Sequence, residues 1–202
     1  IVDWSNDTST GKPTALRLGA SAWGDPQPHR GIICKWDRTR VWIERTSAFN
    51  NSLPLILDDT KHAKSKDDIG GQGRGRGTLT GVQKQSTWRG VMLSTGEQRL
   101  TSFTEDGGTR ARVLSFEGPP VLKEGAEGRL VVEEISRRVT QNYGHLGRKV
   151  VDYLVHHHSS WDEIRSLYEN RRHHFASICS DAVGGRLSDY AAALDLARGV
   201  CE

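Results

Sequence analysis

Short runs of large apolar residues, each stopped by polar or turn-forming residues, dominate the first half of the chain. Three such runs stand out: Leu53–Leu57, Trp88–Leu93 and Val113–Glu117. An apolar run without polar alternation is typical of a strand that is buried on both faces of a parallel sheet. Ile1, Val2 and Trp4 predict a further strand at the start of the chain. The pattern therefore predicts an α/β fold with a mostly parallel sheet.

The second half of the chain has helical spacing instead. Apolar residues three and four apart, or a high content of Ala and Leu, predict helices at Ala15–Trp23, Val41–Asn50, Leu130–Tyr143, Leu146–Val155 and Arg186–Val200. Ser160 and Glu163 form a capping box that predicts the start of a helix running to about Cys179. Gly184 and Gly185 are expected to separate that helix from the last one. The order of elements predicts an α/β region at 1–125 and an α-helical region at 126–202.

Composition restricts the class of protein. The 202 residues are 35% apolar and 26% charged, which suits one domain of ordinary size. No apolar run approaches the ~20 residues of a membrane span. The cysteines Cys34, Cys179 and Cys201 lie far apart, which argues against a disulfide framework and favours a cytoplasmic protein. The chain begins at Ile1, so we interpret it as a piece of a longer protein.

The segment after the first predicted strand is a candidate phosphate-binding loop. A small polar stretch leads to Gly11 and Lys12 and then to a predicted helix, and exposed backbone N–H groups in such a loop can face an anion. The candidate nucleotide-binding residues are Thr10, Gly11, Lys12, Pro13 and Thr14. The motif departs from G-x-x-x-x-G-K-[ST], because Asn6 replaces the first Gly and Pro13 replaces the residue that would bind magnesium. An ordinary turn before a helix is the alternative.

Polar side chains follow the predicted strands. Asp58 and Asp59 follow one strand, and Ser94 and Thr95 follow another. Because ligands bind at the carboxyl ends of strands in an open parallel sheet, we expect these groups to converge with Lys12 on ATP and Mg²⁺. Lys12 would hold phosphate and Asp58 the Mg²⁺. Asp59 would orient or deprotonate the attacking water, and Ser94 or Thr95 would hydrogen-bond the γ-phosphate or that water. A strand-ending turn is the alternative role for Asp58 and Asp59.

Two other stretches draw attention. Gly70–Gly81 contains six glycines and two arginines, so it cannot form a stable helix and is predicted to be a hairpin or a mobile loop. His156–His158 invites a metal site, but adjacent side chains point in different directions. We therefore expect these histidines to lie at an exposed helix end or loop.

Taken together, these segments resemble a known family, the helicase-like P-loop ATPase domain of phage and mobile-element proteins. This family was long catalogued as a domain of unknown function, and it is similar to the replicative helicases of staphylococcal cassette chromosomes. The resemblance rests on segments that occur in the family's order: Leu55–Thr60, Gly71–Gly77, Thr87–Arg89, Leu93–Gln98, Asp106–Val113, Asn142–His145 and Gly185–Leu187.

The resemblance implies a P-loop NTPase fold. That fold is an AAA+-like three-layer sandwich with a helical lid, related to superfamily III and MCM helicases. Lys12 would be the Walker A lysine, Asp58 and Asp59 the Walker B pair, and Ser94-Thr95 sensor 1. Arg110 or Arg112 would be an arginine finger that reaches the neighbouring subunit of a ring, expected to be hexameric. Surface salt bridges are the alternative role for these arginines.

The resemblance also implies a pore hairpin that contacts DNA. Its phosphate-contacting charges would be Arg74, Arg76 and Lys84, on single-stranded or forked DNA. The family has a helical segment of about ten residues before this stretch, whereas here Ile69 runs directly into Gly70. The first functional hypothesis is therefore an ATP-hydrolysing DNA helicase that acts in replication of a mobile element or phage. A non-hydrolysing relative is the second hypothesis, and a regulatory switch is the third.

Overall fold

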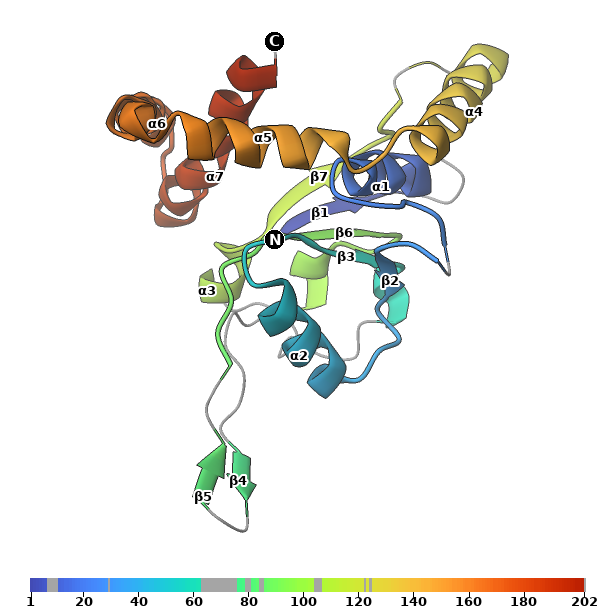
Figure 1. The fold of residues 1–202 in the computed structure, drawn as a ribbon, viewed down its shortest axis with the longest axis horizontal. Coiled ribbons are helices and arrows are strands. Elements are labelled where there is room, and N and C mark those ends of the chain that lie inside the picture. The colour runs from blue at the N-terminus through green and yellow to red at the C-terminus, as the bar shows by residue number, and fades with distance from the viewer. Residues whose placement is uncertain are drawn as a thin grey trace.

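A parallel five-stranded sheet organises the N-terminal part of the protein (Figure 1). The computed structural model describes residues 1–6, 11–28, 30–62, 76–78, 81–83, 86–103, 107–121, 123 and 125–201. The strands are β1 (Val2–Ser5), β2 (Ile33–Lys35), β3 (Leu55–Asp58), β6 (Met92–Gly96) and β7 (Leu114–Glu117), in the order β2-β3-β6-β1-β7. All four pairings are parallel, which confirms the predicted α/β class. The chain leaves β1 for the far edge of the sheet, so β1 and its neighbours form a topological switch point.

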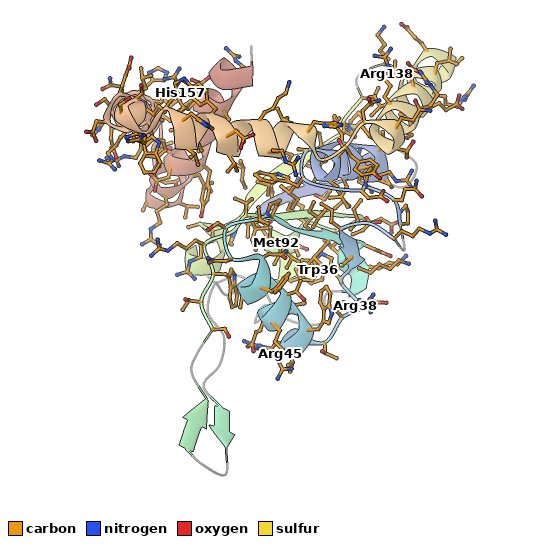
Figure 2. The ribbon with its side chains drawn as sticks, in the orientation of Figure 1. Trp36, Arg38, Arg45, Met92, Arg138 and His157 are labelled. Atoms are coloured by element: carbon orange, nitrogen blue, oxygen red, sulfur yellow. The ribbon has the colours of Figure 1, made fainter. Side chains whose placement is uncertain are left out.

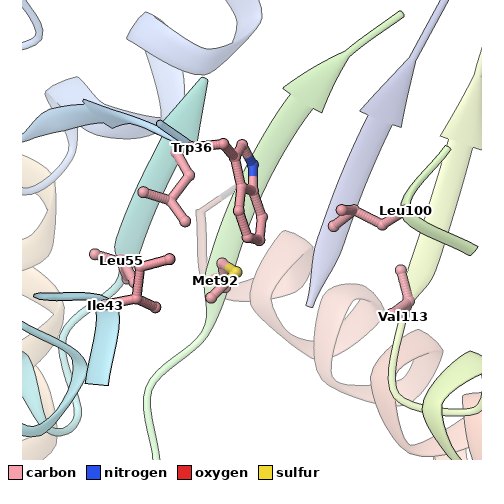
Figure 3. Close-up of a cluster of buried hydrophobic side chains, with 7 residues drawn as sticks. Trp36, Ile43, Leu55, Met92, Leu100 and Val113 are labelled. Atoms are coloured by element: carbon pink, nitrogen blue, oxygen red, sulfur yellow. The ribbon is translucent and has the colours of Figure 1, made fainter. Parts of the chain in front are cut away.

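Helices cover both faces of the sheet (Figure 1). Helix α1 (Lys12–Ser21) packs Leu16 and Ala20 against Ile56 of β3 on one face. Helix α2 (Arg40–Asn50) lies on the other face, where Ile43 joins the larger apolar cluster shown in Figure 3. That cluster consists of Trp36, Ile43, Leu55, Leu57, Met92, Leu100 and Val113. Because β3 buries apolar side chains on both faces, it reads as a continuous apolar run.

In the described residues, the C-terminal part contains four α-helices: α4 (Gly125–Gln141), α5 (His145–His156), α6 (Trp161–Ser177) and α7 (Ala182–Cys201). Helix α4 lies against α1, whereas α6 and α7 pack against each other. The part of the chain that the structure describes holds no helix long and apolar enough to cross a membrane. The division of the chain into two domains near residue 125 stays a prediction.

A two-stranded antiparallel hairpin projects away from the sheet (Figure 1). It is formed by β4 (Arg76–Thr78) and β5 (Gly81–Gln83). The hairpin alternative for Gly70–Gly81 is therefore confirmed in the described residues. Arg74 and Lys84 lie outside them, and Arg76 is placed only by its backbone in β4.

Some predicted boundaries were wrong. Strand β6 begins at Met92 rather than Trp88 and continues through Ser94 and Thr95 to Gly96. The segment before it is held in place differently, by the bond from the backbone N–H of Arg89 to the carbonyl of Asn51. This shift of the strand changes the positions of the two hydroxyl residues, as described below.

Two helix starts also differ from the prediction. Gly184 and Gly185 lie inside the first turn of α7, because the Asp181 side chain accepts a 2.7 Å hydrogen bond from the N–H of Gly184 and starts the helix earlier. Ser160 makes no side-chain capping bond at α6. A short 3₁₀ turn, His158–Ser160, leads into α6 instead and satisfies the Ser160 N–H through the carbonyl of His157. The histidines at 156–158 are exposed, as predicted.

Candidate nucleotide-binding site

The candidate phosphate loop ends in a left-handed glycine. Gly11 caps the N-terminus of α1 with φ 86° and ψ 8°, a conformation that favours glycine over any residue with a Cβ. Lys12 follows it as a buried residue, 6% exposed, and its Nζ donates a hydrogen bond to the carbonyl of Asn6. Lys12 therefore bridges the end of β1 to the start of α1. Thr10 lies outside the described residues.

Pro13 and Thr14 point to different sides of α1. Thr14 is buried, and its Oγ1 lies 3.3 Å from the Oγ of Ser136 on α4. Pro13 lies with Asp58 along one pocket. Proline is tolerated in the first helical turn because that N–H has no partner within the helix. The hydroxyl of Thr14 thus faces α4. Pro13 is the residue on the Asp58 side of α1, and it has no hydroxyl.

Asp58 and Thr95 meet at the carboxyl end of the sheet. They are register partners in the β3–β6 pair, and Thr95 Oγ1 donates a 2.7 Å hydrogen bond to Asp58 Oδ1. Side chains alternate between faces along a strand, so Asp58 shares its face with Ile56, which packs under α1. Asp58 and Thr95 therefore lie on the same face and at the same edge as Lys12. Thr95 is 3% exposed.

Asp59 follows β3 with a positive φ of 69°, a left-handed conformation that is uncommon outside glycine and turns its side chain out of the strand register. Its Oδ2 lies 3.4 Å from the Nζ of Lys61. The half-buried Asp59 carboxylate therefore sits beside Asp58 but in a different local environment.

Ser94 faces the opposite side of the sheet. Its Oγ accepts a 3.0 Å hydrogen bond from Trp36 Nε1 inside the cluster beneath α2. Only Thr95, of the two candidate hydroxyls, therefore lies on the face of Lys12 and Asp58. Trp36 points into the interior of the molecule (Figure 2).

A buried carboxylate that the sequence analysis did not single out lies next to Ser94. Asp3 of β1 is the register partner of Ser94 and is 0% exposed. Its Oδ2 accepts a 2.9 Å hydrogen bond from the backbone N–H of Leu100. Burial raises the pKa of Asp3, while hydrogen bonds from the Leu100 N–H and the Ser94 hydroxyl partly oppose that rise. In the sequence, Asp3 could have been noticed as an acidic residue between Val2 and Trp4 in an otherwise apolar predicted strand.

Arg110 and Arg112 do not lie near Lys12. Both precede β7, at the amino edge of the sheet, and both are exposed. The carbonyl of Arg112 accepts a 2.7 Å hydrogen bond from the amino group of Ile1, which begins the neighbouring strand. The β4–β5 hairpin also leads into β6 at this amino edge. The structure thus brings Lys12, Asp58 and Thr95 together and leaves the two arginines at the opposite edge.

A pocket of about 390 Å³ opens beside Pro13 and Asp58. Its walls come from α1, the end of β2 and the turns on either side of β2. The charged residues among its lining are Arg17, Lys35, Asp37, Arg38 and Asp58. The pocket therefore contains both carboxylates and cations next to the candidate phosphate loop.

These residues do not fit the magnesium site of a P-loop. Such a site needs a loop Ser or Thr hydroxyl in addition to an acidic residue. Pro13 has no hydroxyl, and the Thr14 hydroxyl lies against Ser136. Lys35 is also the register partner of Asp58, so a cation stands beside the one carboxylate that the metal would use.

Comparisons with known proteins match this chain over different extents. Residues 1–88 match the model of a family described as a domain of unknown function, DUF927. No curated protein matches the chain. Among solved structures, the SCCmec type IV Cch active helicase is similar at a TM-score of 0.77 and 20% sequence identity. The match covers 98% of this chain and 37% of the helicase chain. Nearly the whole chain therefore has the fold of part of that helicase, and its first 88 residues resemble the DUF927 family.

Proposed function

We propose that the chain is a nucleotide-binding domain of a DNA helicase or translocase, which holds ATP at the Lys12 loop. One observation carries the proposal. The carboxyl ends of β1, β3 and β6 bring Lys12, Asp58 and Thr95 to one face at one edge of a parallel sheet. Ligands of open parallel sheets bind at this edge, next to a switch point. The fold shared with a helicase supports the same assignment.

The DNA-binding part of the proposal rests on the β4–β5 hairpin, which projects from the amino edge of the sheet. A hairpin that carries Arg74, Arg76 and Lys84 would contact phosphates without reading bases. In this proposal Arg110 or Arg112 acts on a nucleotide held by a neighbouring subunit, since neither lies near Lys12 of its own chain. A ring of subunits with AAA+-like interfaces, expected to be a hexamer, would provide that arrangement.

A non-hydrolysing relative is the second candidate, and the geometry of α1 favours it. Pro13 faces the Asp58 side without a hydroxyl, and Thr14 is turned toward Ser136. In this candidate the chain binds nucleotide weakly or not at all, and it serves assembly or DNA binding rather than translocation. Turnover separates the two candidates, because only the motor hydrolyses ATP.

The test is ATP turnover, measured with and without single-stranded DNA, for the wild type, Lys12→Ala and Pro13→Thr. Turnover in the wild type that is lost in Lys12→Ala supports the motor. An inactive wild type with activity gained in Pro13→Thr supports the non-hydrolysing relative. If Lys12→Ala changes neither nucleotide affinity nor turnover, the nucleotide site itself is wrong. Melting temperatures of the three proteins control for folding.

A further inference from the structure

The pocket beside Pro13 combines a position at the sheet edge with an unusual set of charges. It is lined on one side by Pro13 and Arg17 of α1 and on the other by Ile33 to Lys35 of β2. Arg17 follows Pro13 by four residues, so both lie on one side of the helix. Asp58 also lines the pocket, beside Lys35. The pocket volume of about 390 Å³ is within the range of small-ligand pockets.

Two of the cations in the pocket are not engaged by other side chains. Arg38 lies 3.9 Å from a carboxylate oxygen of Asp37 and 5.4 Å from the ring centre of Trp42. The side chains of Arg17 and Lys35, in contrast, form no hydrogen bond or ion pair with another described residue. Arg17 is half-buried and Lys35 is exposed at the pocket. Their charges are therefore available to an anionic ligand.

The same cations work against a divalent metal at Asp58. Lys35 and Asp58 are register partners on adjacent strands, whose backbones run ~4.8 Å apart, so their side chains leave the sheet on the same face. The positive charge of Lys35 on this face opposes the binding of Mg²⁺ at the Asp58 carboxylate. Pro13 removes the second oxygen that the metal would use. The pocket thus has positive charge where a P-loop protein has its metal ion.

We propose that this pocket binds the phosphates of a nucleotide with Arg17 and Lys35 as fixed counter-charges, so that nucleotide binding does not require Mg²⁺. The inference rests on the proposed nucleotide site at Lys12 and specifies how that site neutralises its ligand. Guanidinium and ammonium groups bond phosphate oxygens strongly, the former in a bidentate manner. The carboxylate of Asp58 then repels the phosphates instead of anchoring a metal.

The test measures the affinity for ATP by calorimetry, in excess Mg²⁺ and in excess EDTA. The wild type is expected to bind ATP in EDTA with an affinity within about threefold of its affinity in Mg²⁺, which is less than one decade in Kd. Arg17→Gln and Lys35→Gln should each weaken binding in EDTA by about tenfold, as expected for a lost charge-assisted bond. Arg45→Gln removes an exposed arginine of α2 that does not line the pocket (Figure 2) and is the matched control.

Asp58→Asn gives a test that depends on the sign of the effect. If fixed cations hold the phosphates, removing this carboxylate raises the affinity in both buffers, because a repulsive charge is lost. If Mg²⁺ mediates binding, the same variant lowers the affinity in Mg²⁺. Inorganic tripolyphosphate, used as a second probe, should follow the same pattern if the phosphates occupy the pocket.

The possible failures are distinguishable. Binding that needs Lys12 and is abolished by EDTA overturns the fixed-cation pocket and leaves the proposed nucleotide site intact. Unchanged affinity in Arg17→Gln and Lys35→Gln, with wild-type melting temperatures, also overturns it. If ATP binds in neither buffer, both the pocket and the nucleotide site are wrong.

Discussion

Thr95 Oγ1 donates a 2.7 Å hydrogen bond to Oδ1 of Asp58, and this bond joins β6 to β3 at the edge where Lys12 begins α1. The Thr95 side chain is nearly inaccessible, whereas Asp58 is half-buried at the pocket. The bond therefore holds the carboxylate in one orientation relative to the candidate phosphate loop.

Thr95→Val should lower the free energy of unfolding by about 1 to 2 kcal/mol, because the isosteric change leaves a half-buried carboxylate without its donor. Thr95→Ser keeps the donor and should retain most of the stability. Urea unfolding monitored by tryptophan fluorescence measures both variants. Equal losses in the two variants would mean that the methyl group, and not the hydrogen bond, stabilises this edge.

Asp3→Asn should remove a pH dependence of stability. The folded protein raises the pKa of Asp3 through burial, so the native state holds its proton to higher pH than the unfolded chain does. The stability of the wild type should therefore decrease as the pH rises from about 4, the ordinary pKa of Asp, through the raised pKa. The variant should gain stability relative to the wild type over that interval. Unfolding free energies at several pH values give the difference, and a constant difference would contradict the prediction.

Gly147→Ala should destabilise the contact between α5 and the end of α1. A Cβ at this position would lie 2.5 Å from Cε3 of Trp23 and 2.9 Å from the carbonyl of Ala22, which accepts the Gly147 N–H at 2.7 Å. The expected loss of unfolding free energy is about 1 to 3 kcal/mol, as for other overpacked sites.

Gly185→Ala is the matched control, because a Cβ there would meet no heavy atom within 4 Å beyond its chain neighbours and the adjoining backbone of α7. This change in the first turn of α7 should raise the stability by about 0.5 kcal/mol through helix propensity. Thermal unfolding compares the two variants. A similar effect of both substitutions would show that contact with Trp23 is not the cause.

The double variant Arg74→Ala/Arg76→Ala should weaken binding to single-stranded DNA and reduce its salt dependence. Each lost phosphate contact lowers the slope of log K against log salt by about 0.7 for a single strand. Fluorescence anisotropy at several salt concentrations measures the slope. Arg165→Ala, on exposed α6, is the control and should leave it unchanged. An unaltered slope in the hairpin variant would show that these arginines do not contact the DNA phosphates.

Part of the arrangement of the candidate site could be predicted because parallel strands share an edge. Lys12, Asp58 and Thr95 each follow an apolar run, and this alone placed them together. The choice between Ser94 and Thr95 could not be predicted, because the strand was expected to end at Leu93. With β6 continuing to Gly96, the two hydroxyls point to opposite faces.

Arg17 and Lys35 could not be found from the sequence as site residues. Lys35 has its proposed role because β2 pairs with β3, which makes it the register partner of Asp58. The order of strands in a sheet depends on crossovers between distant segments, and no local pattern around Lys35 encodes it. The orientation of Thr14 likewise depends on α4, which is more than a hundred residues away along the chain.

The sequence by itself determined the α/β class, the positions of most helices and strands and the polar residues that follow the strands. These properties follow from apolar periodicity and from turn residues, which act over a few positions. Only the tertiary structure decided which of those polar groups share a face, that Asp3 is buried, and that cations line the pocket beside Asp58. Strand order and helix packing set these relationships, because they join residues that are neighbours in space and distant along the chain.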